Sequence, residues 1–116
     1  MSKKVFVLAQ FKPKAGKQNE LFEVLKALEP DSNREDGCIQ YTVTRQIDHP
    51  NGMRNDYPIV FNEIWADAEA LQAHCGRQQI QAFFQSQVVD EQGLVDDAIV
   101  TVYTDEAEHF DHPIYA

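Results

Sequence analysis

The sequence is poor in basic residues and has no long apolar run. Its 116 residues include 10 Lys and Arg against 19 Asp and Glu, which gives a net charge of −9. A field of that sign repels phosphate backbones and argues against nucleic acid as a partner. No apolar run approaches the roughly 20 residues that span a bilayer. Lys12 and Lys14 also follow the N-terminus too closely for the apolar core of a signal peptide. We therefore expect a cytoplasmic protein that binds neither nucleic acid nor a membrane.

Cysteine is scarce as well. Cys38 and Cys75 are the two cysteines, and neither belongs to a CxxC pair. In the cytoplasm both should be reduced, and neither suggests a metal or redox motif. His109 and His112 lie among acidic residues near the end of the chain, but the sequence gives them no fixed scaffold. We predict no metal site.

The composition is that of a folded domain. Hydrophobic residues make up 43% of the chain and charged residues 25%, which favours a globular protein over a disordered one. The length fits one domain with a real core. We expect this domain to cover residues 1–104. Residues 105–116 form a tail that is acidic and then aromatic, and it either packs on a partner chain or is a frayed end.

Periodicity predicts four strands and three helices. Alternating apolar residues place strands at 5–11, 37–45, 58–66 and 95–104, with Ile39, Tyr41 and Val43 on the apolar side of the second. Helices are expected at 17–29, ended by Pro30, at 67–75, capped by Asp67, and from about residue 77. Residues 31–36 read as a polar connection. Residues 48–56 contain a strong turn signal and read as a mobile loop or a lid.

The element order β-α-β-β-α-α-β predicts an α+β fold of the ferredoxin-like, split β-α-β type. This fold has a four-stranded antiparallel sheet with its helices on one face. The strands carry apolar residues on both faces, so such a sheet would leave one apolar face uncovered. We therefore expect a homodimer in which two sheets pack face to face.

Glu63 is the first candidate for a reactive side chain. It lies between Phe61 and Trp65 on one face of a strand, and burying a carboxylate there costs several kcal/mol unless it is paired or protonated, roughly as for any ion in a protein interior. The structural alternatives are a carboxylate on a partly wet sheet face, or one that caps a backbone group.

His74 shares a helix face with Leu71, and Cys75 lies beside it. Its ordinary pKa is close to neutrality, so it is a natural general base. Glu63 could orient it, or act as the base itself if burial raises its pKa. The alternatives are structural: His74 as a core histidine bonded to a backbone carbonyl or to Glu63, Trp65 as core and Tyr41 as core.

The order and spacing of several motifs resemble the antibiotic biosynthesis monooxygenase family. These motifs are Gly37-Cys38 with Tyr41, Glu63-x-Trp65, His74 nine residues after the tryptophan, and Ala82-Phe83. The family consists of small homodimers called dimeric α/β barrels. It includes cofactor-independent oxygenases of quinols and polyketide anthrones, haem-degrading enzymes and an isomerase of a phosphorylated sugar. The resemblance implies a ligand cavity between the sheet and its own helices, with Phe61, Glu63, Trp65 and His74 as candidates to line it.

Departures from the family pattern narrow what the resemblance implies. The haem-degrading branch has its histidine ligand about eighteen residues after the strand tryptophan, where this chain has Phe83, so haem is disfavoured. Many quinol-oxygenase-like members have a second histidine at the place of Gln79. The polyketide oxygenases have an asparagine at the place of Phe61. The polyketide mechanism therefore does not transfer intact.

The resemblance implies a cofactor-independent monooxygenase that acts on a small aromatic or quinol-like substrate. His74 and Glu63 are the expected catalytic residues. The side chains expected to contact the substrate are Trp65, Phe61, Tyr41, Phe84 and Gln79. The alternatives are a ligand-binding or stress-related protein without turnover, and an isomerase on the same scaffold.

Overall fold

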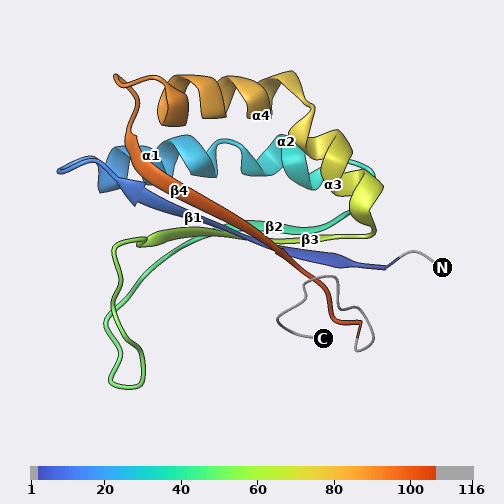
Figure 1. Ribbon diagram of the computed structural model, residues 1–116, viewed down its shortest axis with the longest axis horizontal. Coiled ribbons are helices and arrows are strands. Elements are labelled where there is room, and N and C mark those ends of the chain that lie inside the picture. Colours follow the sequence, from blue (N-terminus) through green and yellow to red (C-terminus); the bar gives the residue numbers. More distant parts are fainter. Residues whose placement is uncertain (1–2, 107–116) are drawn as a thin grey trace, which may run out of the picture.

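In a computed structural model, which describes residues 3–106, the chain forms one antiparallel sheet with helices on one face (Figure 1). The strand order is β2-β3-β1-β4. The strands are β1 (Val5–Pro13), β2 (Cys38–Arg45), β3 (Ile59–Trp65) and β4 (Val95–Tyr103). The helices are α1 (Gln18–Lys26), α2 (Glu29–Asn33), α3 (Ala68–Cys75), α4 (Gln78–Phe83) and a π-helical segment, η1 (Phe84–Val89). The predicted ferredoxin-like α+β fold is confirmed.

Alternation along the two central strands separates an inner face from an outer face. On β1 the inner positions Val7, Ala9 and Phe11 are buried, and they lie opposite Glu63, Phe61 and Ile59 of β3. Because four of these six residues are β-branched or aromatic, they fit a pleated surface that packs on one side, and Ala9 and Glu63 are the exceptions. This inner face is the floor of the core.

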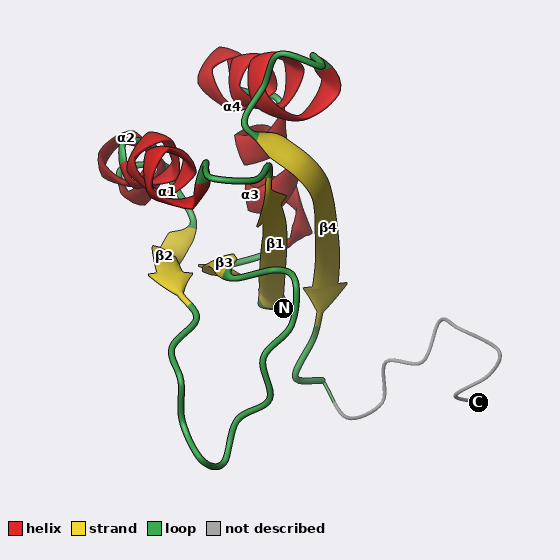
Figure 2. Cartoon of the chain, turned by 90° about the vertical axis from the view of Figure 1, so that its left-hand side faces the viewer, coloured by secondary structure: helices red, strands yellow, loops and turns green. Residues whose placement is uncertain are grey.

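The helices cover the inner face alone, as both ribbon views show (Figures 1 and 2). Leu21 and Leu25 of α1 are fully buried, and Ile80 and Phe83 of α4 are nearly so. Their spacing of three and four residues gives each helix one apolar stripe, which faces the sheet. The core is the layer between these stripes and the inner face.

The prediction that Pro30 ends the first helix is wrong. The α1 helix ends at Lys26, and Pro30 lies in the first turn of the separate short helix α2. Proline is tolerated there because its missing N–H would have no partner in a first turn. The helix also occupies part of the segment that was read as a polar connection, and its Ser32 is fully buried.

A bulge in β2 reverses the expected side of Ile39. The pairing with β3 shifts between Cys38 and Gln40, so the strand has an extra residue at this point. Ile39 is 52% exposed, whereas Tyr41 and Val43 beyond the bulge are buried as predicted. Cys38 packs against the core in place of Ile39.

The loop between β2 and β3 leaves the sheet on the side away from the helices (Figures 1 and 2). Its base is fixed by reciprocal hydrogen bonds: Gln46 Nε2 donates to the Asn55 carbonyl (3.1 Å) and the Asn55 N–H donates to Gln46 Oε1 (2.9 Å). Because this loop points away from the helix layer, it does not act as a lid over the inner face of its own chain.

The outer face of the sheet has no helix over it in the described part of the chain (Figure 2). From the register, its central side chains are uncharged on all the strands: Phe6, Leu8, Gln10, Gln40, Thr42, Thr44, Val60, Asn62, Ile64, Ile99, Thr101 and Tyr103. We call this set the outer face.

Within residues 3–106, no helix is both long enough and apolar enough to cross a bilayer.

Candidate functional site

A cavity of about 110 Å³ lies between the inner face and the helices. Strand residues form its floor, and α1, α3, α4 and η1 form its walls. Among the described residues, the polar side chains in its lining are Tyr41, Glu63 and His74, apart from the Cys75 thiol, and the others are aliphatic or aromatic. An apolar cavity with a few convergent polar groups is the usual form of a small-molecule site.

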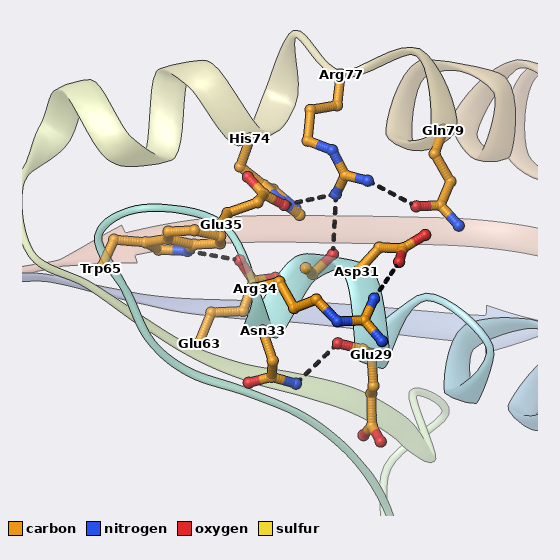
Figure 3. A network of polar contacts seen from close by, with 11 residues as sticks. Glu29, Asp31, Asn33, Arg34, Glu35, Glu63, Trp65, His74, Arg77 and Gln79 are labelled. Atoms are coloured by element: carbon orange, nitrogen blue, oxygen red, sulfur yellow. Dashed lines mark hydrogen bonds and ion pairs between the residues drawn. The ribbon is translucent and has the colours of Figure 1, made fainter.

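Glu63 reaches the cavity from the middle of β3. It is 7% exposed, and its Oε1 accepts a hydrogen bond from Trp65 Nε1 (2.9 Å), the next residue on the same face (Figure 3). Burial raises the pKa of Glu63 to about 7, against the smaller lowering effect of the Trp65 hydrogen bond, and the charge of Glu35 raises it further. The carboxyl group can therefore hold or release a proton near neutral pH.

His74 enters from the last turn of α3, and 4% of the residue is exposed. Its ring packs against Trp65 (centroids 4.6 Å apart) and Tyr41 (5.0 Å). Its Nδ1 lies 2.8 Å from Glu35 Oε2. Its Nε2 makes no hydrogen bond within residues 3–106. Every fully buried side-chain nitrogen or oxygen in that range has a hydrogen-bond partner, so Nε2 is not fully buried. Nε2 is thus an available acceptor or donor for a ligand.

The structure pairs His74 with Glu35 and pairs Glu63 with Trp65. The sequence left two roles open for Glu63, and the first of them, to orient His74, is not supported by a hydrogen bond between the two side chains among the described residues. Glu35 was missed because it lies in the segment read as a polar connection, 39 residues before His74. The clue in the sequence was weak: Gly37 follows Glu35 closely and marks a tight turn before a strand.

Arg77 completes a polar cluster at this end of the cavity wall (Figure 3). Its Nη1 donates to Glu35 Oε2 (2.6 Å) and lies 3.4 Å from Ser32 Oγ, and its Nη2 donates to Gln79 Oε1 (2.9 Å). Burial lowers the pKa of His74, the contact with Glu35 raises it, and the charge of Arg77 lowers it.

The other predicted substrate contacts divide into two groups. Phe61, Tyr41 and Phe84 line the cavity. Trp65 is fully buried behind Glu63 and His74, and Gln79 faces Arg77, so neither lines the cavity. Burial raises the pKa of Tyr41 above its usual range, which leaves its hydroxyl protonated at neutral pH.

The cysteines are not activated nucleophiles. Burial raises the pKa of Cys38 to about 11 and also raises that of Cys75, so both favour the thiol form. Within residues 3–106 no group of three His, Cys, Asp or Glu side chains is arranged to hold a metal ion. His109, His112 and most of the 105–116 tail lie outside the described residues.

Fold and site together define a class: ferredoxin-like proteins with an apolar cavity between the sheet and its helices. The antibiotic biosynthesis monooxygenase family model matches residues 4–86, and the chain belongs to that family. No curated protein matches the chain.

Solved structures from several organisms have the same fold. The SO0527 protein of Shewanella oneidensis is 30% identical, with a TM-score of 0.75 over 90% of this chain and 92% of that one. Rv0793 of Mycobacterium tuberculosis is 27% identical, with a TM-score of 0.70 over 90% and 98%. A candidate antibiotic biosynthesis monooxygenase of Deinococcus radiodurans is 18% identical, with a TM-score of 0.70 over 93% and 97%, and shows the fold alone.

Proposed function

We propose that this protein is a cofactor-independent monooxygenase that oxidises a small aromatic or quinol-type substrate in the cavity. The observation that carries the proposal is that His74 and Glu63 both reach a largely apolar cavity. The Nε2 atom of His74 is available for a ligand, and the carboxyl group of Glu63 has a pKa of about 7. Family membership supports the reaction class.

In the proposed reaction, His74 Nε2 takes the proton from a substrate hydroxyl. The resulting anion is electron-rich, and it passes one electron to O₂. The substrate radical and superoxide then form a C–O bond at a carbon that bears a hydrogen, and His74 returns its proton to the resulting peroxide. The O–O bond breaks as that carbon loses its hydrogen as a proton, so water leaves and a carbonyl remains. One oxygen atom enters the product and the other leaves as water. All four electrons that reduce O₂ come from the substrate, two for the inserted oxygen atom and two for the oxygen of water, so the reaction needs no further reductant.

Glu63 has a different role in this scheme. When protonated, it donates a hydrogen bond to the substrate oxygen that becomes negative, while Trp65 Nε1 holds its other oxygen in place. The apolar lining excludes water, which strengthens this interaction and protects the anion from reprotonation.

The cavity favours a small, uncharged substrate. Among the described residues, no Lys or Arg lines it, and Arg77 is occupied by Glu35 and Gln79. A phosphorylated substrate would have no counter-charge there, which disfavours the isomerase alternative. The volume of about 110 Å³ is below the roughly 150 Å³ of a cavity that accepts benzene. A single ring therefore fits best, and only with some opening of the helix layer.

We also propose that the reaction uses no haem. The helical position that carries the iron ligand in haem-degrading relatives is occupied by Phe83, whose ring packs edge-on against Phe11 with centroids 5.8 Å apart. An aromatic ring offers no lone pair to iron, and this one fills the core.

Oxygen consumption tests the proposal. The purified protein is offered a panel of reduced quinols, from single-ring quinols to larger anthrones, and uptake is compared with the spontaneous rate. The single-ring compounds should be the best substrates. His74→Ala should lose roughly 100-fold or more of the enzymatic rate, because a general base typically contributes at least that much. His49→Ala, in the exposed loop between β2 and β3, removes the same side chain away from the cavity and should leave the rate unchanged.

The outcomes separate the alternatives. Uptake lost in His74→Ala but retained in His49→Ala supports the oxygenase with His74 as its base. A folded His74→Ala protein with unchanged uptake removes His74 from the mechanism. Ligand-induced stabilisation with no uptake above the spontaneous rate would favour a binding protein without turnover.

We further propose that the protein is a homodimer joined through the outer face. In a chain with net charge −9, an uncharged sheet face lets two copies meet without burying charged groups. Two charged residues, Lys12 and Asp97, lie on the same side of the sheet just beyond the outer face, where the register makes them neighbours.

A further inference from the structure

The imidazole of His74 is held by a carboxylate from another part of the chain. Glu35 Oε2 lies 2.8 Å from His74 Nδ1 and also accepts from Arg77 Nη1 at 2.6 Å. The side chain of Glu35 is 13% exposed and that of His74 is 5% exposed. A carboxylate in such surroundings is screened little by solvent, so the charge of Glu35 acts strongly on the imidazole.

The backbone around Glu35 fixes where its carboxylate lies. The Glu35 N–H donates to the Ser32 carbonyl (3.2 Å), and the Glu35 carbonyl accepts from the Cys38 N–H (3.1 Å). Gly37 adopts a φ of +83°, and the chain there passes so close to α3 that a Cβ would lie 2.6 Å from the Ala70 Cβ. This turn brings Glu35 against the helix that carries His74.

We propose that Glu35 is a positioning residue that keeps the proton of neutral His74 on Nδ1 and so presents the lone pair of Nε2 to the cavity. A carboxylate has no hydrogen to donate, so the nitrogen beside it must be the donor. Arg77 supplies the counter-charge on the same carboxylate oxygen and fixes its position. The inference rests on the proposed role of His74 as a base, but the tautomer itself is measurable without any substrate.

Proton transfer then has a defined course. The proton leaves the ligand hydroxyl and binds Nε2, the proton on Nδ1 stays in place, and the imidazolium that forms lies beside the Glu35 carboxylate. Among the described residues, the other charged or titratable groups on this side of the cavity are Arg77 from the α3–α4 turn, Cys75 from α3, and Glu63 and Tyr41 from the sheet. Glu35 favours the cation and Arg77 opposes it.

Nitrogen-15 NMR of the histidine-labelled protein tests the inference in the absence of ligand. We expect neutral His74 to show the Nδ1–H tautomer in the wild-type protein. Glu35→Gln should lower the pKa of His74, since the negative charge is lost, and Arg77→Gln should raise it, since a positive charge is lost. Asp31→Asn removes an exposed carboxylate of α2 that does not contact His74, and it should leave both quantities unchanged.

Opposite shifts of the His74 pKa in the two variants would show that both charges act directly on the imidazole, because a loss of packing alone would move the pKa in the same direction in both. The Nε2–H tautomer in the wild-type protein would overturn the inference without any variant. A shift in Glu35→Gln no larger than in Asp31→Asn would also overturn it. The Nδ1–H tautomer together with no oxygen uptake would sustain the positioning role and overturn the proposed function instead.

Discussion

Glu63 is a carboxyl group whose protonation should affect the stability of the whole chain. Its pKa is raised from 4.5 to about 7 in the folded protein, so between these values the folded state holds a proton that the unfolded state has released. The stability that comes from the neutral carboxyl is present below about pH 4.5 and is lost as the pH rises through about 7.

We therefore expect Glu63→Gln to become more stable relative to the wild-type protein as the pH rises from about 5 to about 8. Glutamine stays neutral across this range, so the difference in unfolding free energy should change by up to about 3 kcal/mol. Urea denaturation at several pH values measures it. Glu23→Gln, on the exposed side of α1, is the matched control. A flat difference would mean that Glu63 stays charged throughout.

At the residue scale, the sequence identified side chains but not their partners. Glu63 and His74 stood out because a carboxylate between aromatics and a histidine on an apolar stripe both conflict with local pattern. Glu35 and Arg77 are charged residues in a polar context, and nothing local distinguishes them from surface residues. They meet His74 only because the folded chain packs the turn before β2 against α3.

At the element scale, Gly37 sets how closely the turn before β2 packs against α3. We expect Gly37→Ala to lower the free energy of unfolding by roughly 2–4 kcal/mol, from the left-handed backbone and the clash with Ala70 together. Gly16→Ala is the control: Gly16 has a φ of +75° but open space around it, so only the backbone cost of about 1–2 kcal/mol applies.

A double-mutant cycle isolates the contact. Ala70→Gly removes the methyl group that the new Cβ would meet, so the combined Gly37→Ala, Ala70→Gly protein should recover part of the loss, as measured by chemical denaturation. Strictly additive effects would show that α3 yields to the added methyl group at little cost, and that Gly37 does not set the distance between the two elements.

At the element scale, regular segments were predictable and irregular ones were not. Two-residue alternation located the strands, and apolar spacing with the Asp67 cap located α3, where the Asp67 side chain accepts from the Ala70 N–H. The bulge at Ile39 escaped because it changes the pairing without changing the composition of the strand. The π-helical segment η1 escaped because its apolar residues, Phe84 and Val88, also fit an ordinary helical stripe.

For the whole molecule, the outer face predicts association. We expect sedimentation of the wild-type protein at micromolar concentration to give a dimer. Leu8→Lys places a charge in the middle of the outer face and should give a monomer, because the dimer would bury two like charges. Gln81→Lys makes the same change in charge on the exposed side of α4 and should remain dimeric. A monomeric wild-type protein would rule out this mode of association.

Trp65 gives the site an optical signal of its own. It is the single tryptophan of the chain, it is fully buried, and it contacts the two proposed reactive residues of the cavity: its Nε1 donates to Glu63, and its ring packs on His74. Indole emission responds to polarity, to hydrogen bonding at Nε1 and to quenching by a protonated imidazole. The intrinsic fluorescence of this protein should therefore follow the protonation of the cavity and the entry of a ligand with no added label.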